Sequence, residues 1–89
     1  MLKISTTKQF EKDIARIKKQ RKDLKKLGDI IEKLANGDPL PAHNRNHKLK
    51  GNYVDRWECH IAPDWLLIYR KSKSEIRFER TGSHSDLFK

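Results

Sequence analysis

The chain has little of what stabilises or targets many other small proteins. Cys59 is its only cysteine, so an intramolecular disulfide is impossible. No apolar run approaches the roughly 20 residues of a membrane-spanning helix, and the N-terminal segment lacks the long apolar core of a signal peptide. These absences predict a cytoplasmic protein that does not enter membranes. The 89 residues predict a single domain, residues 1–89, with a small core.

Acidic residues are also scarce relative to basic ones. The chain has 21 Lys and Arg against 12 Asp and Glu, a net charge of +9. The excess is uneven, with 14 basic against 6 acidic residues in 1–50 and 7 against 6 in 51–89. Such an excess on a small domain indicates a polyanionic partner, of which nucleic acid is the most common and an acidic protein the next.

The N-terminal half predicts two helices. Apolar residues recur at helical spacing over residues 8–19. Asp23 is a candidate N-cap for a second helix, and Gly37 suits the left-handed position at its end. The short connection between the helices predicts an antiparallel hairpin. Residues 38–46 contain two prolines and predict a loop.

The C-terminal half predicts strands with tight turns, one of them at Pro63-Asp64. The stretch Trp65–Tyr69 is apolar on both faces, which is typical of a central strand covered on both sides. The element order predicts an α+β fold, in which the helical hairpin packs on one face of a small antiparallel sheet and the other face stays partly open. The predicted strands are Leu2–Ser5, His47–Lys50, Tyr53–Ile61, Trp65–Arg70 and Glu75–Thr81.

Strict alternation along residues 56–61 separates apolar from titratable side chains. It places Trp57, Cys59 and Ile61 toward the core and Arg56, Glu58 and His60 toward the open face. Glu58 is then a general base, an ion-pair partner of Arg56 or a solvated carboxylate. The same rule turns Arg80 toward the core, and only a bend or bulge near Glu79 brings it to the open face.

Three histidines near strand ends, His47, His60 and His84, predict acid–base chemistry, because imidazole exchanges protons near neutral pH. A metal-independent ribonuclease needs one group to deprotonate the ribose 2′-OH and another to protonate the leaving 5′-oxygen. Arg56 and Arg80 are candidate cations for the charge that builds on phosphorus. Trp65, whose position beside a turn leaves core and surface both open, and Phe88 are candidates for stacking on an unpaired base.

A metal site is the rival interpretation of the same residues. His43 and His47 have half of a zinc spacing, and Cys59 with His60 adds two donors. Structural zinc sites normally use four ligands in paired spacing, several of them cysteine. The pattern does not meet that requirement, so we predict no metal and no cofactor, and His43 is interpreted as a surface residue.

Three segments together resemble toxins of the RelE superfamily, in its YafQ branch: NHKLKG (46–51), ECHIAPDWLLIY (58–69) and RFERTGSHSDLF (77–88). The resemblance implies a RelE-like, microbial-RNase-like fold. It also implies an endoribonuclease that cuts mRNA in the A site of the 30S ribosomal subunit, amid ribosomal RNA, and that a cognate antitoxin neutralises in a hetero-oligomeric complex.

The resemblance also implies roles for individual residues. It assigns acid–base work to His47, His60, Asp64 and His84, and phosphate stabilisation to Arg80. Trp65 and Phe88 would hold the base, and Glu58 is a weaker assignment. The alternative is a non-catalytic protein of the same fold that binds only RNA or an antitoxin.

Overall fold

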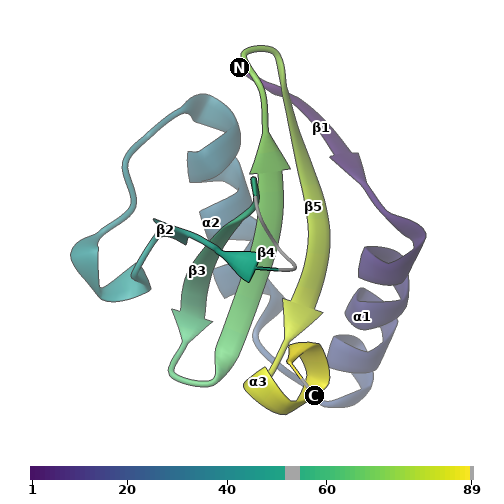
Figure 1. Ribbon diagram of the computed structural model, residues 1–89. Coiled ribbons are helices and arrows are strands. Elements are labelled where there is room, and N and C mark those ends of the chain that lie inside the picture. The colour runs from purple at the N-terminus through teal and green to yellow at the C-terminus, as the bar shows by residue number, and fades with distance from the viewer. Residues whose placement is uncertain (52–54, 89) are drawn as a thin grey trace.

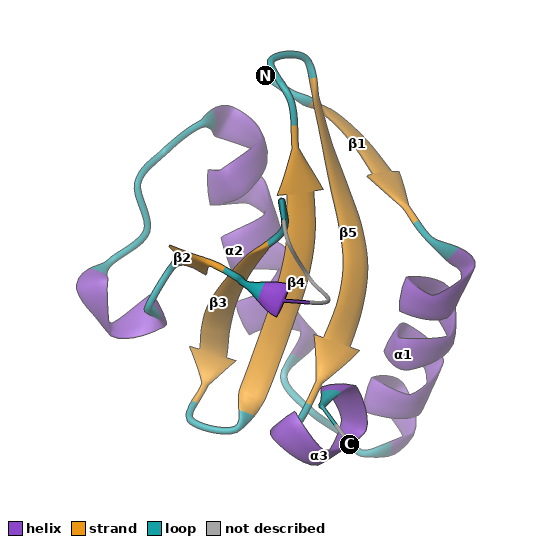
Figure 2. Cartoon of the chain, viewed as in Figure 1, coloured by secondary structure: helices purple, strands orange, loops and turns teal. Residues whose placement is uncertain are grey.

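The computed structural model describes residues 1–51 and 55–88, and the strands in these residues form one five-stranded sheet (Figures 1 and 2). The strand order is β1-β5-β4-β3-β2. The α+β class is as predicted, but the sheet is mixed, because β1 runs parallel to β5 while the other neighbours are antiparallel. A long crossover through the helices permits this parallel pairing. The elements are β1 (Lys3–Thr6), α1 (Lys8–Lys19), α2 (Leu24–Asn36), η1 (Ala42–Asn44), β2 (His47–Lys48), β3 (Trp57–Ala62), β4 (Trp65–Lys71), β5 (Glu75–Gly82) and α3 (His84–Leu87).

The two long helices begin and end at local signals. The Thr7 hydroxyl accepts a hydrogen bond from the Phe10 amide at 3.0 Å at the start of α1, which spans the predicted residues 8–19. The Asp23 carboxylate accepts one from the Lys25 amide at the start of α2. Gly37 ends α2 with a φ of 78°, the left-handed conformation that glycine adopts without strain.

The main core lies between the helices and one face of the sheet. Helix α1 packs on β5 and α2 on β3 (Figure 1). Cys59 and Ile61 are buried in this core and Trp57 packs against it, which confirms the predicted alternation on β3. Strand β4 is central, and Trp65–Tyr69 is buried throughout, as expected for a strand covered on both sides. The predicted strand Tyr53–Ile61 begins at Trp57, because residues 55 and 56 are not in a strand and 52–54 lie outside the described residues.

The opposite face of the sheet is partly covered by a second apolar cluster. Leu66 and Ile68 of β4 pack there with Leu87, and Leu49 adds to them. Leu87 is placed by α3, a short helix that the sequence interpretation did not predict. Its signal is a capping box in which Ser83 and Asp86 exchange backbone and side-chain hydrogen bonds.

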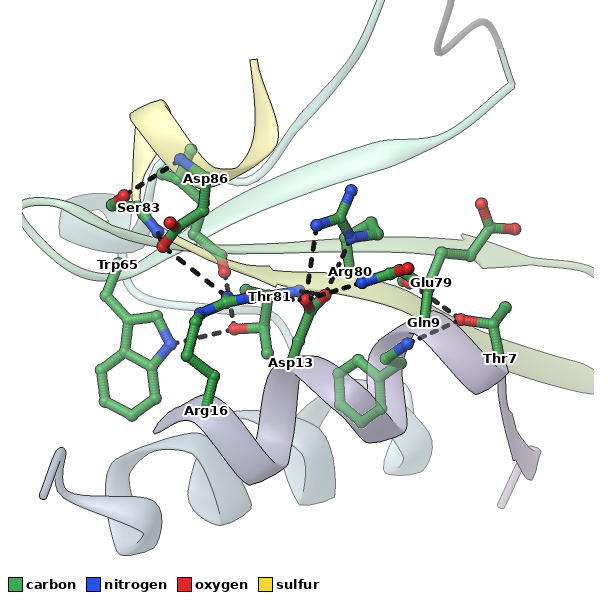
Figure 3. Close-up of polar contacts among 12 residues, drawn as sticks. Thr7, Gln9, Asp13, Arg16, Trp65, Glu79, Arg80, Thr81, Ser83 and Asp86 are labelled. Atoms are coloured by element: carbon green, nitrogen blue, oxygen red, sulfur yellow. Dashed lines mark hydrogen bonds and ion pairs between the residues drawn. The ribbon is translucent and has the colours of Figure 1, made fainter. Parts of the chain in front are cut away.

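Asp13 ties α1 to the end of β5 (Figure 3). Its side chain is fully buried, and it accepts hydrogen bonds from the Thr81 amide at 3.1 Å and from Arg16 at 2.9 Å. Arg80 and Gln9 also donate to it. Burial raises the pKa of this carboxyl, but the four donors outweigh that effect and hold the pKa below its ordinary value of 3.8.

We predict that Asp13→Asn destabilises the protein by about 1–3 kcal/mol at pH 7, less than the loss from a fully buried ion pair, because both arginines are partly exposed. A carboxyl whose pKa is lower in the folded state stabilises it above the unfolded pKa and loses that effect as pH falls through the folded pKa. The stability difference between wild type and variant, measured by urea unfolding, should therefore shrink below about pH 4. A difference that stays constant from pH 7 to 3 would contradict the ionised, hydrogen-bonded carboxylate.

Candidate active site

Strand register places the predicted site residues in two rows across the face that lies opposite α1 and α2. His47 pairs with Glu58, Glu58 with Ile68, and Ile68 with Arg80, so these four side chains form one row from β2 to β5. His60 pairs with Leu66 in the next row, and Leu66 pairs with Gly82. Residues far apart in the sequence therefore meet on one face, with Leu66 and Ile68 as an apolar floor between them.

Arg80 joins this face because β5 carries a bulge. The pairing passes from Ile68 with Arg80 to Tyr69 with Phe78, which leaves Glu79 as an extra residue. Phe78 remains in the main core, while Arg80 is turned to the side of Ile68. The Arg80 guanidinium lies against Asp13, with Nε 2.8 Å from Oδ2 and Nη2 3.3 Å from Oδ1 (Figure 3).

His84 and Asp64 form a hydrogen-bonded pair at the exposed end of the site. The Asp64 Oδ1 accepts from the backbone amide of His84 at 3.0 Å and lies 2.9 Å from the ring Nδ1. These two contacts, the amide first, hold the pKa of Asp64 below its ordinary value. An ionised carboxylate only accepts hydrogen bonds, so Nδ1 donates to it and Nε2 is left for other partners.

His60 faces His84 from β3. The centroids of the two imidazole rings are 6.0 Å apart, and the rings meet nearly edge to face. His60 is largely buried at the end of β3, whereas His84 is exposed at the start of α3. The Asn44 side chain donates to the carbonyl of His60 at 2.7 Å, which fastens the η1 loop to the edge of β3.

Glu58 lies between two histidines and is buried, although strict alternation predicted it on the open face. Its Oε1 is 3.5 Å from His47 Nε2 and 3.6 Å from His60 Nε2. The neighbouring rings cover the carboxylate, which explains the burial. The backbone carbonyl of Arg45, an acceptor only, lies 2.6 Å from His47 Nδ1, so that nitrogen is protonated as well.

Trp65 is not available to a substrate. Its side chain belongs to the main core, the residue is 3% exposed, and its indole N–H donates to the Thr81 hydroxyl at 2.9 Å. The prediction that Trp65 stacks on a base is therefore wrong, because its ring points toward the helices. Phe88 is 41% exposed and its ring lies 6.3 Å from that of His84, so it can reach a substrate. Arg56 is paired with Glu79 across the sheet.

A groove of about 750 Å³ opens beside His60 and His84 and extends along η1 to α2. Lys26, Lys33 and Arg45 contribute cations to its lining, and His43 also lies there. In the residues that the structure describes, no group of three potential metal ligands comes together. No helix among those residues is long and apolar enough to cross a membrane.

Sequence reasoning missed Asp13, the residue that holds Arg80. The available signal was a carboxylate on the apolar stripe of the first helix, between Phe10 and Ile17. A buried acidic residue needs partners, and the periodicity that revealed the helix could not say which residues those partners were.

A helical layer on one face of a small sheet, with three histidines gathered at the other, is the arrangement of the class of RelE-type toxins. The chain belongs to the YafQ family, described as bacterial toxins of type II toxin-antitoxin systems, whose model matches residues 2–89.

Individual relatives agree with this assignment. The chain is 41% identical over 81 residues to the mRNA interferase toxin YafQ of Escherichia coli strain K12, covering 90% of this chain and 88% of that protein. Its fold matches a toxin chain in the E. coli DinJ-YafQ toxin-antitoxin complex with a TM-score of 0.92, at 38% identity over 99% of this chain and 98% of that one. It also matches a metal-bound toxin from Helicobacter pylori with a TM-score of 0.93, at 42% identity over 99% and 100% of the two chains.

The burial of Trp65 predicts a structural role for its indole. We expect Trp65→Phe to lower the free energy of unfolding by about 1–3 kcal/mol, because the substitution removes the hydrogen bond to Thr81 and leaves a small cavity. Trp57→Phe, at an indole that is only partly buried, should cost less. Urea unfolding followed by circular dichroism measures both, and an unchanged midpoint for Trp65→Phe would contradict the buried position.

Proposed function

We propose that this chain is a ribosome-dependent endoribonuclease that cuts mRNA in the ribosomal A site and thereby stops translation in the cytoplasm. The observation that carries the proposal is the pair His60 and His84, whose rings face each other 6.0 Å apart across a groove edge. Two imidazoles at this separation can serve the two ends of one phosphodiester transfer. The membership of the YafQ family and the mRNA interferase name of its E. coli relative support it.

The proposed reaction is a transfer within the RNA strand. His60 takes the proton of the ribose 2′-OH, and the 2′-oxygen attacks the adjacent phosphorus. The bond from phosphorus to the 5′-oxygen breaks, and His84 gives its Nε2 proton to that leaving oxygen. The products are a 2′,3′-cyclic phosphate and a 5′-hydroxyl, and both proton transfers use imidazole without a required metal.

The surrounding residues suit these two roles. The Asp64 carboxylate lies 2.9 Å from Nδ1 of His84 and orients the ring, which leaves Nε2 to serve the leaving oxygen. Glu58 orients His60 from its buried position. Arg80, at one end of the first row, supplies positive charge for the phosphorane oxygens, and His47 adds a third imidazole at the other end. Phe88 provides a ring for a base near His84.

Substrate positioning falls to the ribosome in this proposal. Most of the excess positive charge lies in residues 1–50, which contain α1 and α2, and cations there attract ribosomal RNA without reading its sequence. When the ribosome orients the mRNA against a site with few catalytic groups, the gain in rate is catalysis by positioning. A cognate antitoxin would bind this basic chain in a hetero-oligomeric complex, as DinJ binds YafQ in the E. coli toxin-antitoxin complex.

We predict that His84→Ala and His60→Ala each slow cleavage by about 10²–10⁴-fold, the usual contribution of one proton transfer. The measurement is primer-extension mapping of an mRNA that is being translated in a reconstituted system, with ribosome binding assayed in parallel. Ser85→Ala changes an exposed neighbour on α3 and should cut at the wild-type rate.

Two outcomes would count against the proposal. Wild-type rates in both histidine variants would remove the acid–base assignment. A wild-type protein that binds ribosomes but leaves the mRNA intact would favour the non-catalytic alternative.

A further inference from the structure

The carboxylate of Asp13 binds Arg80, the one arginine in the first row of site residues. It receives two contacts from Arg80, to Nε at 2.8 Å and to Nη2 at 3.3 Å (Figure 3). A two-point contact between a carboxylate and a guanidinium fixes the plane of the guanidinium as well as its position. The side chain of Arg80 is 24% exposed while that of Asp13 is fully buried, so the fixed group borders solvent and its anchor does not.

The Thr81 amide alone does not account for a charged residue at position 13. The Thr81 amide needs an acceptor, because β1 pairs with β5 only as far as Phe78. A neutral side-chain carbonyl would supply that acceptor at lower desolvation cost. The negative charge is accounted for by the two guanidinium groups of Arg16 and Arg80 that it binds.

The network also reaches the element that carries His84. Arg16 donates to the Thr81 carbonyl at 2.8 Å, and its Nη2 lies 3.6 Å from Asp86, whose carboxylate caps α3. Asp13 and Arg16 together therefore link α1 to the end of β5 and to the first turn of α3. The position of Asp13 therefore affects Arg80 directly and the first turn of α3 through Arg16.

We propose that Asp13 is a positioning residue for catalysis, which holds the Arg80 guanidinium in the plane from which it stabilises the charge on the phosphorane oxygens. This inference rests on the proposed ribonuclease function. Asp13 touches no substrate and acts through Arg80. It should therefore affect the rate of the chemical step and leave ribosome affinity unchanged.

The test is a double-mutant cycle with wild type, Asp13→Asn, Arg80→Ala and the double variant, assayed by single-turnover cleavage of mRNA on saturating ribosomes. We expect Arg80→Ala to lower the rate by about 10²–10³-fold, as for the loss of one preorganised charge donor. Asp13→Asn should lower the rate by about 10–100-fold alone, but by less than about threefold in the Arg80→Ala background.

Multiplicative losses in the double variant would overturn the proposal, because Asp13 would then act independently of Arg80. Ribosome affinity measured for the same proteins separates a change in the chemical step from a change in binding. Gln9→Ala is the matched control, since it removes a 3.3 Å hydrogen bond to Asp13 but none to Arg80, and we expect it to cut within about twofold of wild type.

Arg80→Lys tests the proposal even where Asp13→Asn does not fold. Lysine keeps the positive charge but cannot make the two-point contact, so cleavage should fall by at least about tenfold with ribosome binding retained. A wild-type rate in Arg80→Lys or in Arg80→Ala would overturn the proposal. Absence of cleavage by wild type itself would instead overturn the ribonuclease function, so the two failures are distinct.

Discussion

The bulge at Glu79 is the constraint on which the two faces of the sheet depend. Side chains alternate along a strand, so one extra residue reverses the side to which every later residue points. Because of it, Phe78 stays in the main core while Arg80 pairs with Ile68 on the opposite side. Thr81 then returns to the core, where its hydroxyl bonds to the Trp65 indole. Without the bulge, the charged arginine would point into the main core.

On the face opposite α1 and α2, each histidine of the site and Arg80 lies beside a carboxylate. Glu58 lies between His47 and His60, Asp64 is paired with His84, and Asp13 with Arg80. Each of these histidines and Arg80 therefore has a carboxylate that orients it, and Leu66 and Ile68 form the apolar floor between them. Fixed, partly desolvated charges stabilise a developing negative charge better than mobile solvated ones do.

The helices could be predicted from the sequence because their signals are local. The stripe over residues 8–19, the cap at Asp23 and the glycine at position 37 each depend on neighbours within a few residues. The central position of Trp65–Tyr69 followed from its apolar character on both faces.

The remaining features depend on partners distant in the sequence. The face on which Arg80 lies depends on a bulge that is defined only by the pairing of β5 with β4. The parallel pairing of β1 depends on where β5 lies in the sheet. The place of Trp65 beside a turn left core and surface both open, and the resemblance implied a role in holding the base. In the structure the indole is buried in the main core and bonds to the Thr81 hydroxyl. Helix α3 has four residues, too few for a periodic pattern, and only its capping box marked it.

The chemistry of the cut ends tests the central claim most directly. Wild-type protein would be given a translated mRNA in a reconstituted system, and the ends of the fragments would be identified by enzymatic end-labelling and mass spectrometry. Attack by the 2′-oxygen predicts a 5′-hydroxyl on one fragment and a 2′,3′-cyclic phosphate, or the 3′-phosphate formed from it, on the other. A 5′-phosphate facing a 3′-hydroxyl would contradict the assignment of His60 and His84 as base and acid.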